Sequence, residues 1–507
     1  MIDLFAGPGG LGEGFTAFRD KASRPVFRIA LSVEKDPIAC ETLKLRSFFR
    51  QFSTSQTPNE YYDYMRGRIC KEELYCRHPK QHKRAEEEVW NAELGNDRLF
   101  PFSEVNTRIR GSLGAANKHW VLIGGPPCQA YSIAGRSRVI PVDRREGTSV
   151  YENDKRHFLY RAYLRVLAEH RPSVFVLENV KGILSAEVGG KRIIDRLLSD
   201  LQRPSKAWRG EESSRPEGVE YDIHPIAEYG GRSQAELLPS PRDFIVRSEE
   251  HGIPQARHRL ILVGVRKDVG IKPGKLALSR DKVSMWSAIG ELPKLRSRTK
   301  NGQPWAATIR SIMTPSLAND SSVEPRMLNA IKNELRRLSD DLTTGDTFLA
   351  CEVRSAFEAE WFNDPRIGGV CHHMARGHMD SDLWRYFFGA CYAQLKGKSP
   401  TLDDFPRALL PNHKNLKKQK GETVFKDRFR VQVKNSPAST ITSHISKDGH
   451  YFIHPDPLQC RSLTVREAAR LQTFPDNYVF AGGPTQQYQQ VGNAVPPLLA
   501  KKIAAIV

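Results

Sequence analysis

Short apolar runs recur along the chain, and most are followed by a glycine, a proline or an acidic residue. A helix-like stretch at residues 157–170 lies between two of the runs. Strands that alternate with helices predict an α/β fold with a mostly parallel sheet covered on both faces. The apolar runs are residues 2–5, 27–33, 120–123, 174–177 and 260–265.

Residues with chemical functions follow these predicted strands. A glycine-rich turn, Glu34, Cys128 and Glu178 each come after an apolar run. Because ligands bind at the carboxyl ends of the strands in such sheets, we expect these residues at one edge. The motif QARHR at 255–259 precedes its run instead, so it reaches that edge only if its strand is antiparallel. The sequence therefore predicts a mixed sheet with a reversed strand near residues 259–265.

The turn AGPGGLGEG and Glu34 together favour a nucleotide-containing cofactor. Glu34 stands 20 residues after Gly14. At about that distance an acid hydrogen-bonds a ribose hydroxyl in nucleotide-binding α/β folds. The glycine pattern alone also occurs in plain turns, and this alternative stays open.

Cys128 is the candidate nucleophile. It follows two glycines and two prolines in GGPPCQAYS at 124–132. The prolines fix φ and stiffen the turn, while the glycines leave room for a ligand. The alternative is a buried turn cysteine without a catalytic role.

The length of the chain and the pattern of its predicted elements indicate that it is divided into domains. We expect a catalytic domain over residues 1–270 with an insertion at about 45–118, a second domain over 271–450, and a return to the catalytic domain over 451–507. Thr464 and Glu467 fit a capping box ahead of an apolar helical face.

Charge and cysteine content narrow the class of partner and compartment. The 507-residue chain has 77 Lys and Arg against 58 Asp and Glu, a net charge of +19, which favours a polyanionic partner. Residues 412–434 hold six Lys and two Arg against one Glu and one Asp. With no long apolar stretch and eight scattered cysteines, we expect a soluble, cytoplasmic protein with reduced thiols and no contact to a membrane.

Six ordered motifs resemble the DNA cytosine-5 methyltransferase family. They cover about half of the chain and leave residues 40–118 and 295–450 unexplained. The motifs are DLFAGPGG at 3–10, GGPPCQAYS at 124–132, ENV at 178–180, QARHR at 255–259, LTVREAARLQTFPD at 463–476 and QQVGNAVPP at 489–497.

The resemblance implies a Rossmann-like, S-adenosylmethionine-dependent methyltransferase fold with an inserted, smaller target-recognition domain. It implies that Cys128 attacks C6 of a cytosine, that Glu178 hydrogen-bonds N3, that Arg259 holds the carbonyl oxygen on the ring, and that Arg257 is a positioning group near the phosphates. The residues implied to bind S-adenosylmethionine are Phe5, Gly7, Gly9, Leu11, Glu34, Pro126 and Asn493.

The implied partner is double-stranded DNA with the target base flipped out of the helix, because C6 is closed to attack within a stacked duplex. The segment 132–155 resembles a mobile basic lid, with an ordinary solvated loop as the alternative. The candidate DNA-binding residues are Gln129, Ser132, Arg136, Arg138, Gln255, Arg376, Lys417 and Lys418.

The chain departs from the family pattern in places. Only Met1 and Ile2 precede Asp3, so a short first strand is expected. No clear acid for the adenine amino group follows Glu34, and Asp97 and Glu104 are weak candidates. Histidines and cysteines cluster at 70–82 and 371–378, but neither cluster has paired zinc-ligand spacing, and no metal is expected.

Several functions compete with DNA methylation. They are RNA cytosine methylation, a non-catalytic DNA-binding homologue, and a dinucleotide-dependent oxidoreductase that would leave five motifs unexplained. For the leading hypothesis we expect a monomer, with a cognate restriction endonuclease or defence-system proteins as possible companions.

Overall fold

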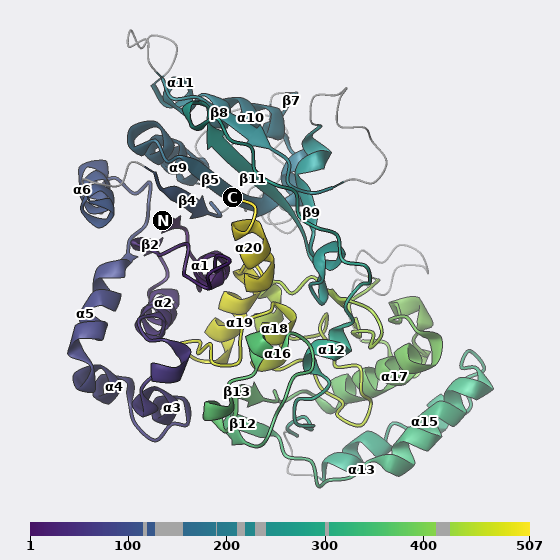
Figure 1. The fold of residues 1–507 in the computed structure, drawn as a ribbon. Helices are drawn as coiled ribbons and strands as arrows, with labels where there is room; N and C mark the ends of the chain where they lie inside the picture. Colours follow the sequence, from purple (N-terminus) through teal and green to yellow (C-terminus); the bar gives the residue numbers. More distant parts are fainter. Residues whose placement is uncertain are drawn as a thin grey trace.

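The computed structural model describes residues 1–114, 119–126, 156–188, 190–209, 218–228, 240–299, 304–411 and 426–507. Figure 1 shows a sheet flanked by helices and, beside it, a largely helical part coloured green. Both chain ends lie near the sheet, with α1 and α20 next to one another.

A mixed sheet forms the centre of the first part. The strand order is β3-β2-β1-β4-β5-β11-β8, and β9 pairs with β11. The first five strands are parallel, whereas β11 runs antiparallel to β5, β8 and β9. This confirms the reversed strand and the mixed, mostly parallel sheet. The strands are β1 (Ile2–Leu4), β2 (Leu31–Glu34), β3 (Val89–Asn91), β4 (Val121–Gly124), β5 (Val174–Val180), β8 (Tyr221–His224), β9 (Ile245–Arg247) and β11 (His258–Arg266).

Apolar side chains of both faces of the sheet are buried under helices. In β5, Phe175 and Leu177 pack with α6, α9 and α10, while Val174 and Val176 pack with α1 and α20. This two-sided burial explains why the strands are continuous apolar runs. The covering helices are α1 (Gly10–Ala17), α6 (Phe102–Leu113), α9 (Arg156–His170), α10 (Ile193–Gln202), α11 (Pro204–Arg209) and α20 (Pro497–Ala504).

The predicted insertion at 45–118 contributes to both parts of the molecule. Its strand β3 extends the central sheet beside β2. Its helices bury aromatic residues against the hairpin β12–β13, and the Tyr62 hydroxyl donates to Asp364 Oδ2 at 2.9 Å. The elements are α2 (Pro37–Arg50), α3 (Asn59–Met65), α4 (Lys71–Arg77), α5 (Pro79–Glu88), β12 (Gly345–Ala350) and β13 (Gly369–Met374).

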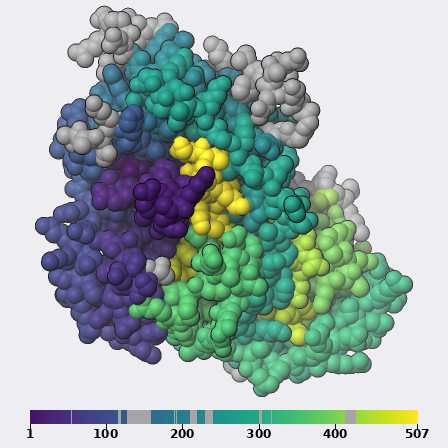
Figure 2. All heavy atoms as spheres, viewed as in Figure 1, coloured from purple at the N-terminus to yellow at the C-terminus, as the bar shows by residue number. Residues whose placement is uncertain are grey.

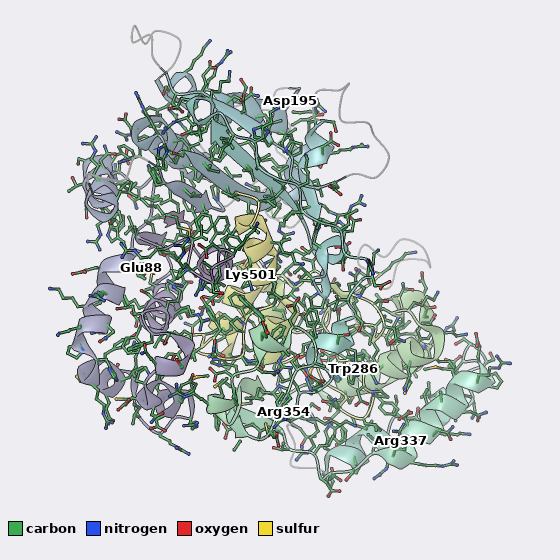
Figure 3. The ribbon with its side chains drawn as sticks, in the orientation of Figure 1. Glu88, Asp195, Trp286, Arg337, Arg354 and Lys501 are labelled. Atoms are coloured by element: carbon green, nitrogen blue, oxygen red, sulfur yellow. The ribbon has the colours of Figure 1, made fainter. Side chains whose placement is uncertain are left out.

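The segment predicted as a second domain has its own core. Trp305, Tyr386 and Phe388 are buried there with residues of α13, α15 and α17. Arg337 and Arg354 project from its surface (Figure 3). The helices are α12 (Met285–Ile289), α13 (Trp305–Arg310), α14 (Pro315–Ala318), α15 (Pro325–Arg337), α16 (Ala359–Phe362) and α17 (Asp380–Lys396). The domain boundaries themselves stay a prediction.

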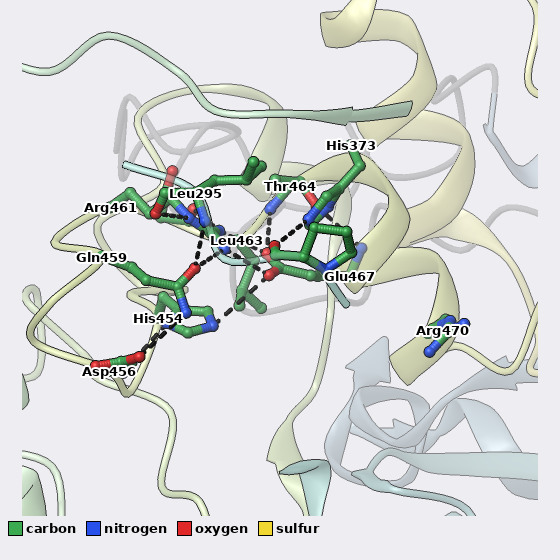
Figure 4. A network of polar contacts seen from close by, with 12 residues as sticks. Leu295, His373, His454, Asp456, Gln459, Arg461, Leu463, Thr464, Glu467 and Arg470 are labelled. Atoms are coloured by element: carbon green, nitrogen blue, oxygen red, sulfur yellow. Dashed lines mark hydrogen bonds and ion pairs between the residues drawn. The ribbon is translucent and has the colours of Figure 1, made fainter. Parts of the chain in front are cut away.

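A buried polar network links α18 to the segment predicted as a second domain. Arg461 Nη1 and Nη2 each lie 2.7 Å from an oxygen of Glu467, and both side chains are almost fully buried (Figure 4). Thr464 caps α18 in the predicted capping box with Glu467, and its hydroxyl contacts His373 Nδ1 at 3.0 Å. The last helices of this region are α18 (Val465–Leu471) and α19 (Pro484–Asn493).

Beside the pair β12–β13, two short ladders complete the described strands. Strands β10 (Gln255–Ala256) and β14 (Ala438–Ser439) pair in parallel, and β6 (Glu187–Val188) pairs with β7 (Lys191–Arg192). Within the described residues, no helix has the length and apolar character needed to cross a membrane.

Candidate active site

The glycine-rich turn lies at the carboxyl end of β1 and is held by Glu34. Gly7 and Gly9 have φ angles of 55° and 91°, a conformation that favours glycine. The Gly7 amide donates to Glu34 Oε2 at 2.8 Å, and the amides of Lys35 and Asp36 donate to Oε1 at 2.9 Å. A carboxylate can accept about four hydrogen bonds, so Glu34 keeps acceptor capacity for a ligand.

The C-terminal segment packs directly on this turn. A methyl group added at Gly10 would lie 2.2 Å from the Val495 carbonyl oxygen, and the Tyr478 hydroxyl donates to the Pro8 carbonyl. Figure 2 shows the corresponding purple and yellow surfaces in contact. Asn493, which ends α19, is exposed close to this junction. The structure therefore brings Asn493 and the glycine-rich turn together.

The other predicted cofactor residues of this turn also lie there. Phe5 has a φ of 56° directly after β1, and Leu11 is buried in the first turn of α1. A side chain added at Gly7 would meet no atom within 4 Å, so the turn is open toward a ligand at this position.

The end of β3 was missed by sequence analysis. Asn91 pairs with Glu34 in the sheet, and its amide donates to the carbonyls of Glu34 and Lys35 at 3.0 Å. Neither Asp97, which lies 3.7 Å from Arg165, nor Glu104, in the first turn of α6, stands at a strand end. The short strand after a long polar helix gave only a weak signal.

Glu178 lies beside the turn that leads to Cys128. A methyl group added at Gly125 would lie 3.1 Å from Glu178 Oε2, and Asn179 Nδ2 donates to the Pro126 carbonyl at 3.4 Å. The predicted residues Cys128, Gln129, Ser132, Arg136, Arg138, Lys417 and Lys418 lie outside the described residues.

Arg259 reaches Glu178 across the antiparallel pair β5–β11. Arg259 Nε lies 2.9 Å from Glu178 Oε1, and the side chains are 13% and 14% exposed. Burial lowers the pKa of Arg259, while the Glu178 carboxylate opposes that shift. The pair can therefore present a carboxyl group and a guanidinium to one ligand in a mostly dehydrated place.

The other two candidate residues of QARHR, Arg257 and Gln255, face the interior. Arg257 Nη1 donates to the Ile441 carbonyl at 2.7 Å, and Gln255 is fully buried with its amide hydrogen-bonded to Leu471 and Gln472. Burial, with a smaller contribution from Arg259, holds the pKa of Arg257 well below its usual range. These contacts indicate positioning roles, and they give no support to a contact of Arg257 with phosphates or of Gln255 with DNA.

Arg376 lies over an aromatic ring. Its Cζ is 3.7 Å from the ring centroid of Tyr488, and the side chain is half-buried. The neighbouring His373 and His378 are buried, with His373 Nε2 bonded to the Pro293 carbonyl at 2.8 Å. Both histidines therefore have hydrogen-bond partners in the interior, His373 at Pro293 and His378 at Ser462. Among the described residues, no group of His, Cys, Asp and Glu has the geometry of a metal site.

Proteins of known family are similar to this chain over most of its length. A family model for C-5 cytosine-specific DNA methylase matches residues 98–203 and 244–507. Type II methyltransferase M.Bpa9945I of Bacillus paralicheniformis is 33% identical, over 100% of this chain and 98% of its own. Type II methyltransferase M.AgeI of Thalassovita gelatinovora is 26% identical, over 78% of this chain and 85% of its own. DNA (cytosine-5-)-methyltransferase M.ApeKI of Aeropyrum pernix is 27% identical, over 76% and 80%. The chain belongs to the C-5 cytosine-specific DNA methylase family.

Proposed function

We propose that this protein transfers a methyl group from S-adenosylmethionine to C5 of a flipped-out cytosine in a short, specific sequence of double-stranded DNA. The observation that carries the proposal is the Glu178–Arg259 ion pair, which lies beside Gly125 at the same sheet edge as the glycine-rich turn. A carboxyl group and a guanidinium placed together match a cytosine, which offers N3 and the carbonyl oxygen O2 beside it.

The residues of the turn fit the proposed cofactor. Glu34 has acceptor capacity for a ribose hydroxyl, the backbone at Gly7 is open, and Asn493 lies close by. When bound there, S-adenosylmethionine would supply an electrophilic methyl group.

The chemistry on the base would come from Cys128 and Glu178. In the proposed reaction, the Cys128 thiolate forms a bond to C6, and the ring electrons move to C5. Glu178 shares a proton with N3, and this hydrogen bond stabilises the charge that arrives on the ring. After C5 has accepted the methyl group, the C5 proton leaves to a base and the bond between C6 and Cys128 breaks, which restores the aromatic ring and the thiolate.

The substrate test is direct. The protein is expressed in a bacterial host without cytosine methylation, and 5-methylcytosine is mapped in genomic DNA at single-base resolution. Methylation in one short sequence context supports the proposal, whereas unmethylated DNA from cells that contain folded protein counts against it. RNA from the same cells is mapped in parallel, because methylation found only there would assign an RNA substrate.

The covalent step has its own test. In duplex DNA with 5-fluorocytosine at the target, the C5 fluorine cannot leave as a proton does, so the adduct should persist. A denaturant-resistant protein–DNA complex is expected with the natural chain and not with Cys128→Ser.

Two of the relatives are named Type II methyltransferases, and we propose a cognate restriction endonuclease as companion.

A further inference from the structure

We propose that Gln255 and Gln472 act as a positioning pair that fixes Asn493 beside the glycine-rich turn. The inference rests on the proposed function, because it assigns the pair to binding of S-adenosylmethionine. Gln255 belongs to β10, and Gln472 directly follows α18. Both side chains are fully buried, at 0% exposure.

The two amides form one continuous chain of hydrogen bonds. Gln255 Nε2 donates to Gln472 Oε1 at 3.0 Å and to the Leu471 carbonyl at 3.1 Å. Gln255 Oε1 accepts from the Ile441 amide at 2.8 Å. Gln472 Nε2 then donates to the carbonyls of Val491 at 2.7 Å and Ala494 at 3.4 Å. A buried side-chain amide without hydrogen-bond partners costs free energy. These hydrogen bonds therefore favour this arrangement of the two side chains over other rotamers.

The carbonyls that Gln472 holds lie on both sides of Asn493. Between them, the Gly492 carbonyl accepts from Arg257 Nη1 and Nη2 at 3.4 Å. A methyl group added at Gly492 would lie 2.2 Å from the Thr442 carbonyl carbon, so the backbone at Gly492 has no room to shift toward Thr442. The backbone around Asn493 is therefore fixed from two directions.

The same segment continues into the contact with the glycine-rich turn. Val495 packs against Gly10, and Ala494 Cβ would lie 3.3 Å from a methyl group at Gly10. A loss of the Gln472 contacts should let the backbone at 491–494 move relative to the turn. The exposed Asn493 side chain would then lose its fixed position toward a bound ligand.

The test measures ligand binding without turnover. Binding of S-adenosylhomocysteine to the full chain is measured by titration calorimetry, without DNA, for the natural chain and Gln472→Met. Methionine has a similar volume and no amide. We expect the Kd to rise about tenfold, the order of effect that follows from loss of one or two buried hydrogen bonds.

A matched control separates positioning from general loss of stability. Gln459 is also buried, and its amide contacts Asp456 in the network of Figure 4 rather than residues 491–494. Gln459→Met should lower the melting temperature and leave the Kd within twofold of the natural chain. Equal Kd values for Gln472→Met and Gln459→Met would overturn the proposal.

A double-mutant cycle tests whether Gln472 acts through Asn493. In an Asn493→Ala background, Gln472→Met should change the Kd by less than twofold, because the group that it positions is gone. An undiminished tenfold effect would contradict this route.

In turnover assays, Gln472→Met should raise KM for S-adenosylmethionine and leave kcat within twofold at saturation. A natural chain that binds no S-adenosylhomocysteine would overturn the proposed cofactor together with this inference, an outcome distinct from the others.

Discussion

Arg259 and Glu178 form an ion pair across two antiparallel strands, with 2.9 Å between Nε and Oε1. The two residues are 81 positions apart in the chain and meet only because β11 is reversed relative to β5. In a wholly parallel sheet, the first residues of β11 would lie at the opposite edge. The reversal therefore places the Arg259 guanidinium next to the Glu178 carboxyl group, near the carboxyl end of the neighbouring strand β5.

Replacing Glu178 by Gln should reduce methyl transfer by about 10² to 10⁴, the usual contribution of a general acid. The duplex Kd should change far less, because phosphate contacts supply most affinity for DNA. Single-turnover rates and fluorescence anisotropy measure the two quantities. Glu187→Gln is the control, since Glu187 is exposed in β6. A rate for Glu178→Gln within threefold of the natural chain would contradict a role in the reaction.

The order of motifs and strands was enough to predict the reversed strand. QARHR comes before its apolar run, while the glycine-rich turn, Cys128 and Glu178 follow theirs, and a shared edge permits only one direction for that strand. Strand β3 could not be predicted in the same way, because it has three residues and its pairing with β2 joins Val89 to Ser32. Such a contact depends on the whole sheet and not on a local pattern.

Burial of polar side chains was the second property that sequence did not reveal. The family resemblance placed Gln255 and Arg257 near DNA, whereas the structure buries both, together with His373. Their partners are distant in the chain: Arg257 binds the Ile441 carbonyl, and His373 contacts Thr464. Each partner satisfies a group that would otherwise be costly to bury. Residue type alone cannot distinguish a polar side chain that faces DNA from one that is buried with a hydrogen-bond partner.

Gly10→Ala should destabilise the protein by about 1 to 3 kcal/mol, as an overpacked core does. The added methyl group would lie 2.2 Å from the Val495 carbonyl oxygen, so α1 and the C-terminal segment would have to separate. Gly111→Ala is the matched control in α6, where no atom lies within 4 Å of the added methyl group. That variant should be more stable by up to about 1 kcal/mol, because alanine favours helices. Denaturant unfolding measures both, and equal signs would refute the steric argument.

Asp3→Asn should protect the fold at alkaline pH. Asp3 is 1% exposed, and burial raises its pKa to about 8 from 3.8. The unfolded chain loses this proton near pH 4 and the folded chain near pH 8, so stability from this group falls as pH rises between these values. The variant has no such proton. From pH 5 to pH 9, the melting temperature of Asp3→Asn should therefore rise relative to that of the natural chain. The control Asp222→Asn, at an exposed position, should show the same pH dependence as the natural chain.

Acid should weaken the junction between α18 and the segment predicted as a second domain. Burial lowers the pKa of His373 to about 4 and of His454 to about 3, from 6.5, and both lie in the Arg461–Glu467 network (Figure 4). Because the unfolded chain takes up these protons near pH 6.5 and the folded chain does not, the free energy of unfolding should fall as pH decreases below 6.5. Each histidine contributes a slope of about 1.4 kcal/mol per pH unit over this range.

The variant His454→Gln isolates this contribution. It removes one proton-binding group, so the slope of unfolding free energy between pH 6 and pH 4.5 should decrease by about 1.4 kcal/mol per pH unit relative to the natural chain. Denaturant titrations at several pH values give the slope directly. His444→Gln, at an exposed position outside the network, provides the comparison. If His454→Gln and the natural chain keep equal slopes, His454 is not held neutral by burial, and the acid sensitivity of the junction must come from other groups.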